Sequence, residues 1–406
     1  MKLQRITYKA GATPVSEFLY GHDLAAGRIT TWSQQAGAQT PQLHSFGYDD
    51  ADQLLSATVT TAGAPVNTYA YTYDPAENRL TEQAGVSSHI ASYNALNQIS
   101  TAPASARTNE WDAMDRLVAV TAGNRKTEFT YDGRSRLASL RLLINGAQAS
   151  LRRFVWRDYQ ICEERDGAGA VTRRFFEHGV KIENGANAGT YFYTRDHLGS
   201  IREVTDSGGN VRARYAYDPF GRRTRVAGDL EADFGFTGMF FTLEAGLALA
   251  TFRAYDPELG RWLSRDPLPD AEVEEGPNLY SYVASNPINL VDPLGLCCED
   301  EKKAFTSLLQ VSARNCEILM EAANRKCGNG SMGADGENDP ESSVAGVLGD
   351  LWFPSDVFRC ARLYHKAKEQ CDAQSLELSI AADALFRCQI LPCKPCPPPQ
   401  APAPTE

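Results

Sequence analysis

A short motif recurs about every twenty residues along the first part of the sequence, and this periodicity restricts the possible folds more than any other feature. Each copy starts with an aromatic residue followed by Asp or Asn, and an aliphatic residue follows six or seven positions after the aromatic one. The copies begin at Tyr48, Tyr73, Tyr93, Trp111 and Tyr131. Between them lie alternating, β-branched stretches interrupted by Gly, which is the pattern of exposed strands and tight turns.

The motif predicts one β-hairpin per copy. A strand ends at the aromatic residue, Asp or Asn opens a tight turn through local hydrogen bonds, and a returning strand follows. A single hairpin cannot bury its own apolar face, so we expect stacked copies to form long sheets, in a mainly β fold that builds a partial β-shell. An ordinary β-sandwich is the alternative, but sandwiches do not repeat such a side-chain signature.

Cysteine usage divides the chain into two unequal parts. Only Cys162 precedes residue 297, and the other nine cysteines lie in the last 110 residues. This asymmetry predicts a second domain with its own stabilising chemistry, oxidised outside the cytosol. The 406 residues leave ample length for two or more domains with sizeable cores.

Charge and hydropathy exclude some classes of function. The net charge is −11, and neither part of the chain has a basic excess, so no nucleic-acid-binding surface is signalled. The sequence has no apolar run of eighteen residues, and its first residues lead into polar sequence rather than a signal peptide. We therefore expect no transmembrane helix, and export would not depend on this N-terminus.

The periodicity changes to helical spacing after residue 299. Two segments with apolar residues every three or four positions, around 305–327 and 357–388, predict a small helical hairpin. The cysteines on each segment are eleven residues apart, close to three helical turns. Antiparallel packing would give the pairs Cys316–Cys371 and Cys327–Cys360, and would bring Cys388 beside Cys297 and Cys298. Parallel packing fits the first four cysteines equally well but leaves Cys388 beside Val344, so we favour the antiparallel set with Cys298–Cys388.

Zinc is the alternative for the last cysteines. Cys393 and Cys396 have the CxxC spacing of a zinc site, but His365 is the only histidine after residue 296. Disulfides are therefore favoured, and no metal or cofactor is expected. An acid–base couple of His365 with Glu369 is less favoured than an exposed helix pair, and the Pro-rich residues 391–406 are expected to be disordered.

A second signature carries a family resemblance. The string Asp196, His197, Leu198, Gly199 and Ser200, followed by Tyr-Asp-Pro-Phe-Gly at residues 217–221, resembles the Tyr-Asp (YD) repeats of the Rhs family. This family is related to the C subunits of Tc toxin complexes and to teneurins, and the resemblance covers about residues 40–296. His197 titrates in a useful range for catalysis, but its place in a strand-and-turn signature favours a structural role.

The resemblance also gives the sequence DPLGL at residues 292–296 a meaning. In polymorphic Rhs proteins, a β-shell encloses a C-terminal effector and an aspartic-peptidase-like centre cuts the chain after this motif, which implies cleavage after Leu296. Two close carboxylates cannot both ionise cheaply, so one can donate a proton while the other activates water. We assign Asp266 and Asp292 to this pair, with Arg265 holding one carboxylate ionised.

Other acidic residues near the boundary have different interpretations. Asp256 also precedes a proline, and there the simpler role of opening a turn is favoured. The segment between Pro267 and Pro277 is longer and more acidic than is usual in the family. It contains the rival carboxylates Asp270, Glu272, Glu274 and Glu275.

These observations predict four regions: YD repeats over 1–190, an Rhs core-associated domain over 191–296, a cysteine-rich helical domain over 297–390, and a tail over 391–406. The predicted function is an Rhs-type scaffold that encloses and releases a C-terminal effector or toxin. Expected partners are secretion-system or toxin-complex components and an immunity protein, with a secreted or cell-surface location. A surface adhesion protein with a helical cap and a truncated Rhs remnant are the alternatives.

The cysteine register gives a first testable prediction. Peptide mapping without reductant should recover Cys316 linked to Cys371 and Cys327 linked to Cys360, because an antiparallel hairpin brings these positions together. Each bridge would stabilise the domain by roughly 2–4 kcal/mol. Recovery of Cys316 and Cys371 as free thiols would refute the ladder.

Overall fold

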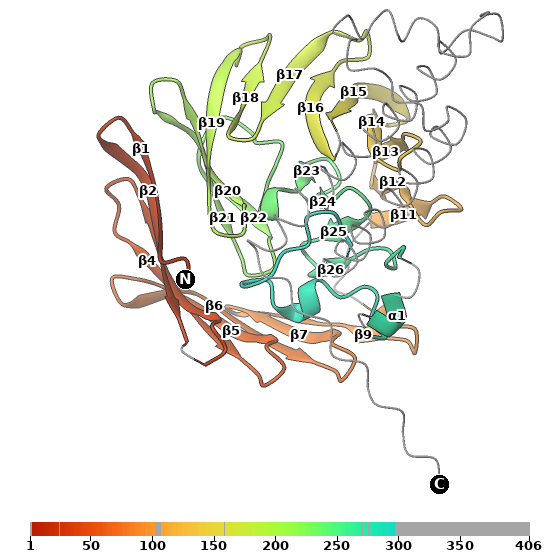
Figure 1. Ribbon diagram of the computed structural model, residues 1–406. Helices are drawn as coiled ribbons and strands as arrows, with labels where there is room; N and C mark the ends of the chain where they lie inside the picture. Colours follow the sequence, from red (N-terminus) through yellow and green to blue (C-terminus); the bar gives the residue numbers. More distant parts are fainter. Residues whose placement is uncertain are drawn as a thin grey trace, which may run out of the picture. The chain divides into compact units, whose positions relative to one another are not determined.

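The computed structural model describes residues 2–23, 25–101, 107–157, 159–268, 271–274 and 276–296 (Figure 1). Within these residues the fold is mainly β, as predicted, and the sheets are open. The predicted helical hairpin, its three cysteine pairs and the Pro-rich tail lie outside the described residues.

The first sheet has eight antiparallel strands in sequence order, each paired with its neighbour in the chain. Its strands are β1 (Arg5–Ala10), β2 (Thr13–His22), β3 (Ile29–Ala36), β4 (Gln42–Tyr48), β5 (Leu54–Thr61), β6 (Ala64–Tyr73), β7 (Arg79–Ala84) and β8 (Ser87–Ile90). A separate two-stranded sheet follows, formed by β9 (Ser92–Tyr93) and β10 (Ile99–Thr101).

The second large sheet has twelve antiparallel strands, again in sequence order. They are β11 (Arg107–Trp111), β12 (Leu117–Ala122), β13 (Arg125–Tyr131), β14 (Leu137–Ile144), β15 (Ala147–Arg157), β16 (Gln160–Arg165), β17 (Val171–Phe176), β18 (Gly179–Ile182), β19 (Gly189–Arg195), β20 (Ile201–Asp206), β21 (Val211–Tyr217) and β22 (Arg223–Gly228). Because β18 pairs with β19, this sheet runs without interruption through the expected domain boundary at residue 190.

Four short strands form the last sheet, in the order β23 (Phe240–Thr242), β24 (Leu247–Leu249), β25 (Ala254–Asp256) and β26 (Arg261–Trp262). Short helical turns accompany them: η1 (Phe236–Gly238), α1 (Ala271–Glu274) and η2 (Val283–Ser285).

Each motif copy is a hairpin closed by its acidic side chain, as the unit at Tyr131 shows. Tyr131 pairs with Leu137, and between them Oδ1 of Asp132 accepts hydrogen bonds from the amides of Arg134 (2.8 Å) and Arg136 (3.0 Å). Ser135 takes a φ of 60° in this turn. Burial opposes ionisation of Asp132, but the hydrogen bonds from Arg136 and the turn amides outweigh it and lower the pKa of Asp132.

The same two contacts to the turn side chain recur along both large sheets. They are found at Asp49, Asp74, Asn94, Asp112, Asp166, Asp196, Asp206 and Asp218. Three of these turns, at Asp166, Asp196 and Asp206, have no aromatic residue before the Asp, so their sequences do not match the repeated motif. The copy at Tyr73 has one extra residue before its aliphatic position, Leu80. Its aromatic residue therefore pairs with Arg79, the residue before Leu80.

The aromatic residue links each hairpin to the one before it. The hydroxyl of Tyr73 donates to the carbonyl of Leu54 at 2.7 Å, and that of Tyr131 donates to the carbonyl of Leu117 at 2.6 Å. Each acceptor is the first residue of the previous hairpin's returning strand. Tyr48, Tyr93, Trp156 and Tyr217 make the equivalent bond. These bonds satisfy backbone carbonyls at the strand ends and set the spacing between copies.

The residues after the second sheet cover the apolar faces of both large sheets. Phe240 and Leu247 of the last sheet belong to the same buried cluster as Leu140 and Val204 of the second sheet. Ile288, together with Phe220 of the turn between β21 and β22, belongs to a second cluster with aromatic residues of the first sheet. In Figure 1 the short strands β23–β26 follow β22 in colour as the chain passes into this region. This cover is needed because no strand array buries its own apolar face.

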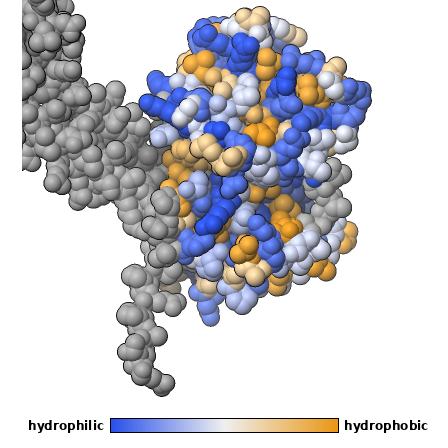
Figure 2. All heavy atoms as spheres, turned by 90° about the vertical axis from the view of Figure 1, so that its right-hand side faces the viewer, coloured by the Kyte–Doolittle hydropathy of each residue, from blue (hydrophilic) through white to orange (hydrophobic). Residues whose placement is uncertain are grey.

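The visible face of the space-filling view carries scattered apolar residues among polar ones rather than a single apolar surface (Figure 2). Exposed apolar side chains among the described residues include Val86, Ile90, Leu96 and Met114. Such isolated residues are ordinary on a protein surface and indicate no site by themselves.

The aromatic link between hairpins gives a second prediction. The substitution Tyr131→Phe removes the hydroxyl donor to the Leu117 carbonyl and should lower the stability of the second sheet by about 1–2 kcal/mol. Hydrogen exchange of β12 and β13 in increasing urea would measure this loss. Tyr159→Phe is the matched control, because Tyr159 is 43% exposed and should lose little. Equal stability of the two variants would contradict the role of the bond.

Candidate functional site

Three segments meet where the last sheet turns toward residue 296. Arg253 lies directly before β25, Asp266 follows β26, and Asp292 opens the DPLGL loop. Two backbone bonds hold the segments together: the amide of Phe252 donates to the carbonyl of Leu294 at 3.0 Å, and that of Asp266 donates to the carbonyl of Leu279 at 3.1 Å. The two aspartates grouped from the sequence, Asp266 and Asp292, therefore lie on segments that are close together in the fold.

A buried guanidinium, that of Arg253, contacts both carboxylates. Its Nη2 lies 2.7 Å from Oδ2 of Asp266 and 3.0 Å from Oδ2 of Asp292. Its Nε donates to the carbonyl of Gly295 at 2.6 Å, and Nη1 donates to that of Leu279 at 3.3 Å. The side chain of Arg253 is 2% exposed, so these partners replace the water it would otherwise bind. We call Arg253, Asp266 and Asp292 the Arg253 cluster.

The carboxylate of Asp292 also shapes the DPLGL loop. Its Oδ1 accepts hydrogen bonds from the amides of Gly295 (2.9 Å) and Leu296 (2.8 Å). Gly295 has a φ of 76°, and a Cβ at this position would lie 3.1 Å from the backbone nitrogen of Arg253. Both the left-handed backbone and the close approach require glycine here. The motif thus places the Asp292 carboxylate within one turn of the Leu296 backbone.

Asp266 has a different environment. Its Oδ1 accepts a hydrogen bond from the amide of Leu268 at 2.9 Å, while Oδ2 contacts Arg253 as an ion pair without hydrogen-bond geometry. Burial raises the pKa of Asp266, although Arg253 and the Leu268 amide act in the opposite direction. Asp266 is accordingly the carboxyl whose environment favours holding a proton.

Aromatic residues surround the cluster. The guanidinium of Arg253 lies 4.5 Å from the centre of the Trp262 ring. Trp262 packs edge-to-face with Tyr282 at 5.6 Å, and both belong to the buried group that contains Leu198 and Val291. Such walls exclude water and strengthen the electrostatic interactions inside them.

The arginine beside Asp266 in the sequence is not the one that contacts it. Arg265 forms an ion pair with Glu272 at 2.5 Å, and both side chains are more than half exposed. Arg253 takes the position expected of Arg265, twelve residues earlier in the chain. No periodicity singles out Arg253, because it precedes a strand whose partners are set only by the fold.

The rival acidic residues divide between described and undescribed positions. Glu272 is occupied by Arg265 at the surface. Asp270, Glu275 and the side chain of Glu274 lie outside the described residues. Asp256 is buried, forms an ion pair with Arg107 of β11, and accepts a hydrogen bond from the Glu258 amide at 2.9 Å. Its geometry is that of the turn residue expected from the sequence.

The signature at residues 196–200 forms one of the hairpin turns, between β19 and β20. Oδ1 of Asp196 accepts from the amides of Leu198 and Ser200, both at 3.0 Å. Oδ2 of Asp196 accepts from Nε of Arg202 at 2.8 Å. Gly199 takes a φ of 84° in this turn. These contacts make the signature a structural junction.

His197 follows Asp196 in the same turn, and its side chain contacts the first sheet. Its Nε2 lies 2.8 Å from the carbonyl of Ile288, and its ring packs against Tyr20 and Trp32 of the first sheet. Within the described part of the chain, its ring contacts neither a nucleophilic side chain nor a carboxylate. The ring therefore fits the structural role expected from the sequence.

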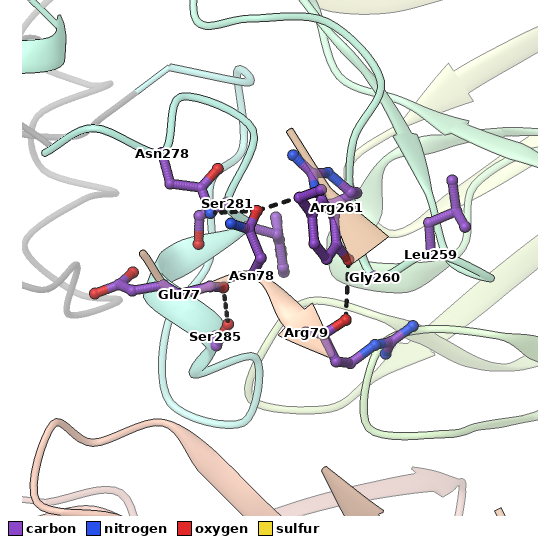
Figure 3. Close-up of a pocket in the computed structure, with 11 residues that line it drawn as sticks. Glu77, Asn78, Arg79, Leu259, Gly260, Arg261, Asn278, Ser281 and Ser285 are labelled. Carbon is purple, nitrogen blue, oxygen red and sulfur yellow. Dashed lines mark hydrogen bonds between the residues drawn. The ribbon is translucent and has the colours of Figure 1, made fainter. Parts of the chain in front are cut away.

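A small polar pocket lies where β6 and β7 approach β26 (Figure 3). Nδ2 of Asn278 donates to Oδ1 of Asn78 at 3.0 Å, and Nη1 of Arg261 donates to the same oxygen at 3.3 Å. The side-chain hydroxyl of Ser285 donates to the carbonyl of Glu77 at 3.4 Å. The pocket lies at the seam between the first sheet and the covering segment, and Nη1 of Arg79 and Oγ of Ser281, on two of the residues that line it, have no hydrogen-bond partner among the described residues.

Among residues 2–296, apart from the few positions the structure does not describe, no group of three or more His, Cys, Asp or Glu residues is arranged to hold a metal ion. No helix within the described residues is long and apolar enough to cross a membrane.

Comparison with known proteins supports a common scaffold. Residues 180–288 match the family model of the teneurin YD-shell. The tRNA nuclease WapA of Bacillus subtilis is 30% identical over 250 residues, covering 55% of this chain and 11% of that protein. The probable deoxyribonuclease RhsA of Dickeya dadantii is 25% identical over 305 residues, covering 73% of this chain and 19% of that protein. The chain thus spans less than a fifth of the length of these relatives.

Solved structures show the same fold. The TcdB2–TccC3–Cdc42 crystal structure aligns with a TM-score of 0.61 at 19% identity, over 73% of this chain and 18% of that one. The Photorhabdus luminescens Tc holotoxin pore aligns with a TM-score of 0.58 at 19% identity, over 70% of this chain and 17% of that one. With the repeated hairpin turns and the signature at residues 196–200, the family-model match and the relatives support an Rhs/YD-repeat family for the chain, and the solved structures show that its fold is the same.

Proposed function

We propose that this chain is an Rhs-type scaffold that encloses an effector or toxin domain formed by the residues after Leu296, and that it releases this domain by cutting itself after Leu296. One observation carries the proposal: Asp266 and Asp292 converge on Nη2 of Arg253, at 2.7 Å and 3.0 Å. Asp292 also accepts the amide hydrogen of Leu296, so the carboxylate pair and the residue before the proposed cut belong to one local structure.

The environments of the two carboxyls suggest separate roles in hydrolysis. Burial raises the pKa of Asp266, so this residue acts as the proton donor to the leaving amine. Asp292 is surrounded by donors from Arg253, Gly295 and Leu296, which suits an ionised carboxylate that takes a proton from the attacking water. Arg253 orients both groups and, through the Gly295 carbonyl, fixes the loop that carries the bond.

The relatives support a scaffold role for the matched residues. Their printed activities differ: WapA is a tRNA nuclease, and the 28% identical protein of Burkholderia cenocepacia is a double-stranded DNA deaminase toxin. Similar identity to proteins with such different activities indicates that the matched residues are a shared carrier. We therefore assign the effector role to residues 297–390, following the division into regions at residues 190, 296 and 390.

The family context also suggests partners and location. Tc toxin components and Rhs toxins among the relatives fit a role inside a toxin complex or a secretion system. We extend this to a secreted or cell-surface location and to an immunity protein that would neutralise the effector. A salivary gland surface protein of Aedes aegypti, 36% identical over 103 residues, is the observation that favours the alternative of a surface recognition protein.

Cleavage is the most direct test. Mass spectrometry of the purified chain should detect a fragment that begins at Cys297, and Asp266→Asn or Asp292→Asn should abolish it because each removes one member of the carboxyl pair. Asp256→Asn is the matched control, since Asp256 is equally buried, precedes a proline and contacts an arginine. It should leave cleavage intact.

An uncut chain with all aspartates present would contradict the self-cleavage proposal and favour the recognition protein or the truncated remnant. Loss of cleavage in Asp256→Asn as well would mean that the substitutions act through folding. Thermal unfolding of the three variants separates that outcome from a specific effect on the reaction.

The two arginines provide a further prediction. Arg253→Met removes the guanidinium that binds two buried carboxylates and contacts the carbonyls of Gly295 and Leu279, and should cost about 3–5 kcal/mol of stability together with the loss of cleavage. Arg265→Met removes only an exposed ion pair and should cost at most about 1 kcal/mol. Denaturant unfolding of both variants measures the difference. If Arg265→Met were the more destabilising variant, Arg265 rather than Arg253 would be the arginine that holds the carboxylates.

A further inference from the structure

Two histidines meet at the contact between the first sheet and the turn at residues 196–200. His44 comes from β4 and His197 from the turn, and both rings pack on the indole of Trp32, with centroid distances of 4.9 Å and 5.1 Å. The Tyr20 ring lies 4.7 Å from His197, and the guanidinium of Arg202 lies 5.4 Å from the Trp32 ring. We call these five residues the histidine junction.

One nitrogen of each imidazole has no hydrogen-bond partner within the described part of the chain. These atoms are Nε2 of His44 and Nδ1 of His197, and both are enclosed. A neutral imidazole can leave one nitrogen as an unused acceptor at modest cost. A protonated ring would instead bury an unpaired N–H donor and a charge, which is far more costly.

The charged groups around the junction act in both directions. Arg202 opposes protonation of His44, whereas at His197 the Asp196 carboxylate and the bond to the Ile288 carbonyl favour the charged ring more than Arg202 and His22 oppose it, so burial is what lowers the pKa of His197. Arg202 already carries a positive charge and acts on both rings, and His22 of β2 acts on His197 in the same direction. Asp196 is the carboxylate that favours a charged His197, but it is bound by Arg202 at 2.8 Å. The remaining neighbours are the aromatic residues Tyr20, Trp32 and Phe46, which carry no charge at neutral pH.

The junction also holds the segment that leads to Asp292. Nε2 of His197 contacts the Ile288 carbonyl at 2.8 Å, and the next residue, Asn289, accepts the amide hydrogen of Ile29 at 2.7 Å. Nδ2 of Asn289 donates to the hydroxyl of Tyr48 at 3.0 Å. If the junction opened, residues 288–292 would lose these contacts together with the first sheet.

We propose that the histidine junction is an acid-sensitive contact: protonation of His44 and His197 releases β2–β4 of the first sheet from the turn at residues 196–200 and frees the segment at residues 288–292. The trigger is the proton itself, and the inference holds whether or not the chain cuts itself after Leu296. It adds a condition, mildly acidic solution, under which the scaffold opens.

The direction of the pH effect follows from the two rings. Burial and Arg202 lower the pKa of His44 to about 3, and burial is the main cause that lowers the pKa of His197. A pKa below the ordinary value of about 6.5 means that the closed state loses stability as pH falls below that value. For His44 alone, the open state should gain about 30-fold in relative population between pH 7.5 and pH 5.0.

Hydrogen exchange of the full chain at pH 7.5 and pH 5.0, corrected for intrinsic exchange rates, tests the proposal. Protection of β3, β4 and residues 196–202 and 286–292 should fall at least about 30-fold, while the hairpin β13–β14 should keep its protection. His44→Phe keeps an aromatic ring on Trp32, and His197→Gln keeps a donor to the Ile288 carbonyl, but neither new side chain can be protonated in this pH range. Each variant should therefore lose less protection at pH 5.0 than the unmodified chain. His178→Gln is the control at an exposed position and should lose as much protection at pH 5.0 as the unmodified chain.

Two results would overturn the proposal. One is equal protection of the junction at both pH values in the unmodified chain. The other is a loss that persists unchanged in both histidine variants. If either variant fails to fold, histidine C2–H exchange in the unmodified chain decides the matter, since midpoints near 6.5 for His44 and His197 would show that the closed state does not resist their protonation.

Discussion

The hydrogen bonds from turn amides to one acidic side chain organise most of this molecule. A residue such as Asp132 binds the amides two and four positions ahead, so the chain reverses with a fixed register and a fixed number of residues. The aromatic side chain before it then donates to the end of the previous hairpin. Because each contact is local or reaches only the adjacent copy, the array can extend through many strands with variable residues between the fixed positions.

Arrays of this kind leave an apolar face that something else must cover. Here the covering segment is the part of the chain after β22, whose strands are two or three residues long and form only one small sheet of four strands. It fills the space with large aromatic side chains, including Trp262, Tyr255 and Tyr282, and it buries several charged residues among them. The Arg253 cluster is one such group: one cation, two carboxylates and two carbonyls contact one another where water is absent.

The two buried polar junctions meet in one segment of the chain. Ile288 and Asn289 contact the histidine junction and the first sheet, while Asp292, a few residues later, belongs to the Arg253 cluster. The segment that leads to the proposed cleavage bond is therefore held at Ile288 and Asn289 and again at Asp292, and the groups that hold it include histidines and carboxyls whose charge depends on pH. This arrangement connects the proposed release of the effector with the packing of the first sheet, through residues in direct contact rather than over a distance.

The sequence by itself determined the hairpins, because aromatic, acidic and aliphatic positions at fixed spacing specify a local hydrogen-bond pattern that needs no distant partner. It also selected Asp266, Asp292 and the turn at residues 196–200 as candidates, through the family resemblance of their motifs. It did not identify Arg253 or Trp32, and it chose Arg265 for the charge beside Asp266. Only the tertiary structure decided those partners, because a buried ion pair is selected by which side chains meet away from water, and chain neighbours such as Arg265 and Asp266 can point to opposite sides.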